Sequence, residues 1–187
     1  VEAAGQGHPA ASLSARNVVV PQAGGFARDH GRNAVQISAV HVDAAIIERT
    51  ARTTMEVSLR NPAGNRQEAQ LVVPVPRGAA VKGFAYQGEA EEPTAKLLSH
   101  EKASSTYRSI VSRMKDPALL EFIGANLVRS SVFPVPADGT QKVKLSYEHI
   151  LPVVNNRIDY VLPRTESLKY NVPWDISVKI NAKRTIS

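Results

Sequence analysis

The feature that most constrains the fold is a strict alternation of side-chain character between residues 51 and 60. The odd positions hold Ala51, Thr53, Met55, Val57 and Leu59, and the even positions hold Arg52, Thr54, Glu56, Ser58 and Arg60. Successive side chains of a β-strand point to opposite faces, whereas a helix buries every third or fourth residue. The segment is therefore predicted to be a strand with one face in a core and the other in water.

Further short runs rich in β-branched residues follow at intervals of about ten residues. They span residues 35–42, 68–76, 81–86, 119–123, 127–135, 142–147, 158–162 and 176–180. Pro74 and Pro76 mark one of these runs as an edge strand or a strand end, because proline cannot donate to a β-ladder. Many short strands at this spacing favour a mainly β fold, an antiparallel β-sandwich-like domain.

One segment breaks the strand pattern. Ala103, Tyr107, Ile110, Val111 and Met114 lie at helical spacing and would form one apolar stripe. Ser99 is suited to cap the N-terminus, and Asp116-Pro117 would end the helix. The pattern predicts one prominent amphipathic α-helix over residues 99–115 that packs on the sandwich.

The N-terminal segment differs in composition from the rest. Residues 1–33 are rich in Ala, Gly, Ser and Gln, and the favoured interpretation is a flexible tail. Residues 17–21 are the one apolar stretch in it, and a short edge strand is the alternative there. The predicted organisation is therefore a tail at 1–33, a domain at 34–163 and a C-terminal strand or connector at 164–187.

Charge and composition exclude several classes of protein. The 187 residues carry a net charge of +6, but the cations are scattered and aromatic residues are only 5%, which favours a solvated basic face over nucleic-acid binding. No apolar run approaches the about 20 residues of a membrane-spanning helix. The absence of cysteine excludes disulfides and thiolate zinc sites.

Two partial matches to metal motifs fail at a ligand position. His100-Glu101 begins like the HExxH zinc motif, but Ser104 stands where the second histidine belongs. The segment 175–179 begins like a DxSxS metal loop, but Lys179 replaces the second serine, and its positive charge would repel a divalent cation. We therefore expect neither a metal nor a cofactor.

The remaining candidates for chemistry also favour structural roles. Glu148 and His149 could form an acid–base pair, but adjacent strand residues point to opposite faces and would not cooperate. Trp174, the single tryptophan, precedes an alternating strand and is expected in the core. No catalytic, cofactor-binding or metal-ligating residue is predicted, and the chain is not expected to be an enzyme.

The order of these segments resembles the VIT domain, the module named after vault proteins and inter-α-trypsin inhibitor heavy chains. The resemblance rests on the Asn61-Pro62 turn, the segments 68–76 and 78–84, Glu101-Lys102-Ala103 followed by Tyr107, and the segments 119–122, 126–136 and 142–148. It covers about residues 35–152 and extends loosely to 163.

The resemblance implies a β-sandwich-like fold without enzymatic activity, as a protein-interaction or scaffolding module. It also implies that the chain is the N-terminal part of a longer, exported bacterial protein. The expected partner is a von Willebrand A domain in the same full-length chain, and the expected location is secreted, periplasmic or at the cell surface. A carbohydrate-binding or anionic-polymer-binding accessory domain is the alternative function.

Overall fold

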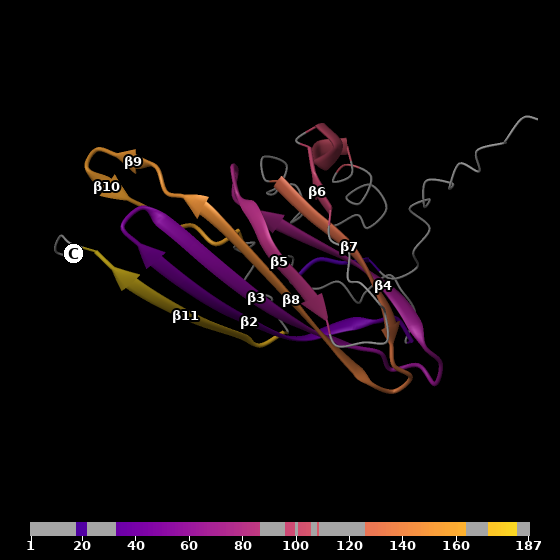
Figure 1. Ribbon diagram of the computed structural model, residues 1–187. Helices are drawn as coiled ribbons and strands as arrows, with labels where there is room; N and C mark the ends of the chain where they lie inside the picture. Colours follow the sequence, from indigo (N-terminus) through magenta and orange to yellow (C-terminus); the bar gives the residue numbers. More distant parts are fainter. Residues whose placement is uncertain are drawn as a thin grey trace, which may run out of the picture.

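The computed structural model describes residues 18–21, 33–86, 96–99, 101–105, 108, 126–163 and 172–182. Within these ranges the chain is mainly β (Figure 1). One sheet has the order β1 (Val18–Val19), β4 (Gln67–Val75), β7 (Asn126–Val135), β6 (Lys96–Leu98). The larger sheet has the order β11 (Trp174–Asn181), β2 (Gln36–Ile47), β3 (Thr50–Arg60), β8 (Thr140–Ile150), β5 (Ala80–Tyr86). A two-stranded hairpin pairs β9 (Val153–Val154) with β10 (Arg157–Ile158).

The two larger sheets share one hydrophobic core. Met55 and Leu145 enter it from the five-stranded sheet, and Leu71 and Val128 enter it from the four-stranded sheet. Most neighbouring strands are antiparallel, but β1 pairs with β4 and β11 pairs with β2 in parallel. The predicted mainly β class is confirmed, and the sheets are mixed rather than purely antiparallel.

Burial along β3 follows the alternation of the sequence. Its buried positions are Ala51, Thr53, Met55, Val57 and Leu59, and the residues between them are exposed or half-buried. β3 pairs on one side with β2 and on the other with β8, so its outward-facing polar side chains lie at the middle of the sheet. The strand predicted at residues 51–60 is confirmed, and so is the prediction that one of its faces lies in the core and the other faces water.

A change of phase in β2 has a local structural cause. The register between β2 and β3 shifts between Ile37 and Ala39, which marks a β-bulge or irregularity. An extra residue in one strand moves the following side chains to the opposite face. Beyond the shift, Val40 and Val42 point into the core, which explains why the apolar residues of the sequence change from odd to even positions.

The proline-containing strand ends where the sequence predicted. Pro74 is the penultimate residue of β4, and Pro76 follows its end. β1 pairs with β4 only through Val18 and Val19, opposite Gln70 and Leu71. Residues 18–19 thus form the short edge strand that was the alternative for this segment, while residues 1–17 and 22–32 lie outside the described residues. The limits of the predicted tail, domain and connector stay predictions.

The long helix predicted over residues 99–115 is not supported. The structure has a short helical segment at 101–105, in which the Ala103 amide donates to the Ser99 carbonyl at 2.7 Å and the Ala103 side chain is buried. The described residues do not include the rest of the predicted apolar stripe, at Tyr107 and positions 110, 111 and 114, or the strand predicted at 119–123. Apolar spacing shows which face a helix would bury, but packing decides how far the helix runs.

Among the residues that the structure describes, no helix combines the length and the apolar character needed to cross a membrane.

A buried asparagine organises the turn that follows β3. The side-chain amide of Asn61 donates to the carbonyls of Asn65, Val135 and Pro136 at 2.8, 3.1 and 3.0 Å. Its side-chain oxygen accepts from the amide of Ala63 at 3.0 Å and from Gln67 at 3.1 Å. The turn predicted at 61–65 is therefore fastened by one side chain to the end of β7 and to the loop before β8.

Candidate interaction surface

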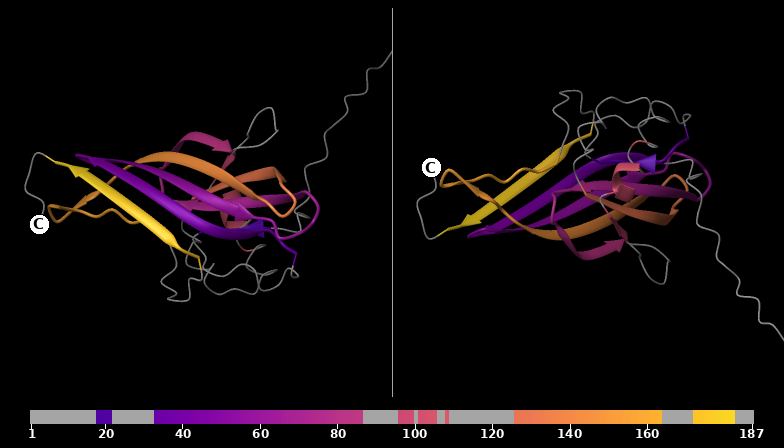
Figure 2. Two further views of the ribbon diagram at one scale, coloured as in Figure 1. Left: turned by 90° about the horizontal axis from the view of Figure 1, so that it is seen from below. Right: turned by 90° about the horizontal axis from the view of Figure 1, so that it is seen from above.

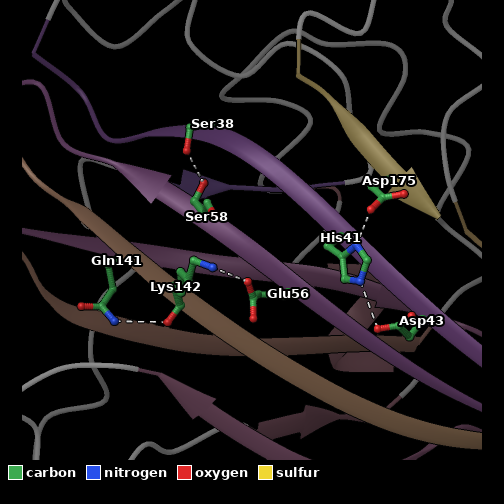
Figure 3. Close-up of polar contacts among 8 residues, drawn as sticks. All are labelled: Ser38, His41, Asp43, Glu56, Ser58, Gln141, Lys142 and Asp175. Atoms are coloured by element: carbon green, nitrogen blue, oxygen red, sulfur yellow. Dashed lines mark hydrogen bonds and ion pairs between the residues drawn. The ribbon is translucent and has the colours of Figure 1, made fainter. Parts of the chain in front are cut away.

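The outer face of the five-stranded sheet is polar and internally paired. Lys142 of β8 contacts Glu56 of β3 at 2.8 Å, between Nζ and Oε1 (Figure 3). The Thr54 and Ser146 hydroxyls lie 3.0 Å apart on the same two strands. Exposed pairs of this kind contribute little stability each, because solvent screens them. The ion pair does neutralise the charge that Lys142 would otherwise present to an anionic ligand.

Glu148 and His149 lie on opposite faces of β8, as strand geometry predicted. Glu148 faces outward and contacts Arg52 at 2.5 Å and Lys82 at 3.4 Å, and the hydrogen bond from Arg52 lowers the pKa of its carboxyl. His149 is buried beside Tyr147 and Tyr160, and burial lowers its pKa. The two side chains do not form an acid–base pair.

A histidine and two aspartates meet on the outer face near the edge of the sheet. His41 Nδ1 lies 2.9 Å from Oδ2 of Asp175 on β11, and His41 Nε2 lies 3.0 Å from Oδ2 of Asp43 (Figure 3). Partial desolvation disfavours the charged ring, but the hydrogen bonds and charges of the two carboxylates outweigh it and raise the pKa of His41. The sequence did not reveal this cluster, because Asp175 lies 134 positions from His41.

The geometry of this cluster is that of an ion-paired histidine. The two carboxylates contact opposite nitrogens of one imidazole ring, so their oxygens do not converge on a common point. In the part of the chain that the structure describes, no group of three or more His, Asp or Glu residues is arranged to hold a metal ion. Of the partial HExxH motif, Glu101 and Ser104 fall in the short helical segment, and His100 lies outside the described residues.

Removing either carboxylate should lower the pKa of His41. In the folded chain the pKa of His41 lies above the usual value of about 6.5. The protonated ring and its two carboxylates therefore stabilise the folded chain below that pH, and this contribution is lost as pH rises through the raised pKa. An NMR titration of the ring protons should show lower values in Asp43→Asn and in Asp175→Asn. His149, on the other face, is the internal control and should titrate unchanged. An unchanged His41 in both variants would contradict the assignment.

Exposed apolar side chains gather at one end of the five-stranded sheet. We call this the hairpin-end patch, and it consists of Ile47, Ile150, Val153, Val154, Ile158 and Val161, which are all exposed. The β9–β10 hairpin that carries part of it turns at Asn155 and Asn156, both with positive φ. Positive φ at two successive residues is typical of a type I′ turn, which matches the twist of a two-residue hairpin.

Several contacts hold this end of the molecule together. Thr50 pairs with both Ile47 and Ile150 across neighbouring strands. The Leu151 amide donates to the Arg49 carbonyl at 2.7 Å, which ties the base of the hairpin to the β2–β3 turn (Figure 1). The patch residues therefore lie at one end of the molecule, with Val153 and Ile158 on one face of the hairpin and Val154 on the other. Exposed apolar side chains that gather in one region mark interaction sites.

These observations define a β-sandwich-like module with a paired polar face and an apolar end. Residues 37–147 match the model of the Vault protein inter-alpha-trypsin domain, the VIT domain, which covers more than half of the 187 residues. The chain belongs to this family, and the resemblance seen in its segments is confirmed.

The other comparisons add little. Two solved structures of an M1 zinc metallopeptidase mutant from Deinococcus radiodurans, one of them bound to a Tyr-Ser-Ala substrate, are similar to this chain at 10% identity and a TM-score of 0.35. The matches cover 66% and 65% of this chain, which spans 22% of the length of each peptidase chain. No curated protein matches the chain significantly.

Proposed function

We propose that this VIT-family chain is a non-catalytic protein-interaction or scaffolding module that docks through the hairpin-end patch. Six large apolar side chains exposed at one end of the sheet carry the proposal. Burying such side chains against a protein contributes about 25 cal/mol for each Å² removed from water. A hairpin with a defined turn also presents Val153, Val154 and Ile158 in a fixed arrangement, which lowers the entropic cost of binding.

The proposed partner is a von Willebrand A domain in the same full-length chain. The position of β11 supports this choice, because the Asn181 carbonyl accepts from the Glu48 amide at 3.0 Å and so brings the end of β11 to the β2–β3 turn. The Leu151 amide ties the base of the hairpin to the same turn, so the end of β11 and the hairpin lie at the same end of the sheet. The proposed setting is a secreted, periplasmic or cell-surface bacterial protein, and its support is the family resemblance.

The alternative of carbohydrate or anionic-polymer binding has less support. The outer face carries cations on β3, β5 and β8, but Lys142 pairs with Glu56, and Arg52 and Lys82 both pair with Glu148. A cation that already has a carboxylate partner gains less from binding an anion, because that pair would have to be given up.

A charge placed in the hairpin-end patch should weaken docking. Val154→Asp adds a carboxylate to an apolar position that is 59% exposed, and we expect binding to a separately produced von Willebrand A domain to weaken about tenfold or more. Isothermal titration calorimetry would measure the change. Ala85→Asp, at an exposed position of β5 that is not part of the patch, is the matched control and should bind as wild type. Equal affinities of Val154→Asp and wild type would contradict the proposal.

A further inference from the structure

The outer edge of β11 is open and half apolar. β11 ends the five-stranded sheet, and within the described ranges no strand pairs with its other edge (Figure 2). Ile176, Val178 and Ile180 lie on the side of β11 that continues the core face of β2, yet they are 42%, 45% and 48% exposed. Long edge strands with exposed apolar side chains are templates for pairing with another strand.

Alternate residues of β11 direct their backbone amides and carbonyls away from β2. The Val40 amide donates to the Pro173 carbonyl, and the Glu48 amide donates to the Asn181 carbonyl, so the odd residues of β11 point their backbone groups toward β2. Successive residues of a strand alternate in this direction. The amides and carbonyls of Ile176 and Val178 therefore point away from β2, where an added strand would meet them.

We propose that a second copy of this chain pairs with this edge, with β11 antiparallel to β11 about a two-fold axis at Ser177. This register sets Asp175 opposite Lys179 of the second copy, and Lys179 opposite its Asp175. On the other face it sets Ile176 opposite Val178. The charged pairs are then of opposite sign, Ile176 meets an apolar residue, and Ser177 faces its own copy on the axis, which is the self-complementarity that a two-fold interface requires. The two five-stranded sheets become one continuous sheet.

The hydrogen-bonding pattern fits the same register. Ile176 and Val178 would form hydrogen-bonded pairs, because their backbone groups point outward. Asp175 and Lys179 would form non-hydrogen-bonded pairs, in which the two Cα atoms approach to about 4.5 Å and side chains are closest. The Asp175 side chain is 80% exposed, so it can meet a lysine while it also contacts His41.

Neighbouring registers lack this complementarity. A two-fold axis at Val178 would set Lys179 opposite Ser177, and an axis at Ile176 would set Asp175 opposite Ser177. An axis at Lys179 would bring two lysines together, which is the usual way that a lysine protects an edge strand. The charges of β11 thus select the Ser177 register. The proposal does not depend on the proposed function, because β11 and the hairpin-end patch have no residue in common.

The charge pair gives a direct test in the full chain. Sedimentation equilibrium over a concentration series should show a monomer–dimer equilibrium for wild type. Lys179→Asp sets aspartates opposite each other twice across the axis and should raise the dimer dissociation constant about tenfold or more. The double variant Asp175→Lys/Lys179→Asp exchanges the charges and should restore the dimer. Thermal melting would establish that each variant is folded.

A proline variant tests the backbone pairing independently of charge. Val178→Pro removes an amide that points away from β2, so the β2–β11 ladder keeps its hydrogen bonds while an added strand loses one. It should shift the equilibrium to monomer. Wild type that stays monomeric up to its solubility limit would overturn the proposal, and a double variant that stays as weak as Lys179→Asp would overturn the Ser177 register. A dimer that Val178→Pro leaves intact would show that the copies meet elsewhere.

Discussion

Replacing Asn61 by alanine should lower the free energy of unfolding by about 3–5 kcal/mol, because several buried polar groups would lose their partner together. Asn61 is fully buried, and its side chain is the hydrogen-bond partner of three carbonyls, one backbone amide and Gln67. Alanine leaves these groups in a site with little access to water. Urea denaturation, followed by circular dichroism, would measure the change.

Asn65 offers a control in the same turn. Its side chain is exposed and donates only a 3.3 Å hydrogen bond to the Arg66 carbonyl. Asn65→Ala should change the free energy of unfolding by no more than about 0.5 kcal/mol. If the two alanine variants were equally stable, the Asn61 hydrogen bonds would not be what fastens this turn to the end of β7.

The second large effect is expected in the core between the two sheets. Leu145 lies on β8, is 1% exposed, and belongs to the cluster to which both sheets contribute. Leu145→Ala should lower the free energy of unfolding by about 2–5 kcal/mol, because the removed methyl groups leave a cavity that the surrounding strands cannot fill completely. The same denaturation experiment would measure it.

Ile150 at the end of the same strand is the matched control. It is an aliphatic residue of the same size, but its side chain is 71% exposed on the opposite face of β8. Ile150→Ala should cost no more than about 0.5 kcal/mol. A similar loss in both variants would show that the alternation of β8 does not separate core from surface.

Strands that are buried on one face could be predicted closely from the sequence. Residues 51–60 alternate between buried and more exposed side chains, because one face of β3 contacts the core and the other contacts water. Every second residue must therefore suit the core. Residues 35–42 also change in sequence from apolar odd positions to apolar even positions, but the irregularity in β2 that causes this change could not be predicted. The extent of the helix was harder to predict. The apolar stripe that begins at Ala103 indicates which face a helix would bury, but it does not indicate where the helix ends.

Most features of the candidate surfaces could not be predicted from sequence patterns. His41 and Asp175 meet only because β11 returns to pair with β2, and nothing in their local sequence indicates that pairing. The alternation of residues 176–180 predicted a strand, but not that it would lie at the edge of the sheet with its apolar residues half exposed. Asn61 was recognised as part of a turn, but two of its five partners, Val135 and Pro136, lie more than 70 positions away along the chain.

The parallel pairing of β11 with β2 also has a consequence for the order of folding. The β2–β3 contact closes through a tight turn, whereas β11 must find a strand about 134 positions away. Closing so long a loop costs more chain entropy and slows the contact. β11 also has half-exposed apolar residues, and among the described strands only β2 pairs with it, so it has fewer contacts to lose than the central strands. It should therefore be the last strand to join the sheet and the first to leave it.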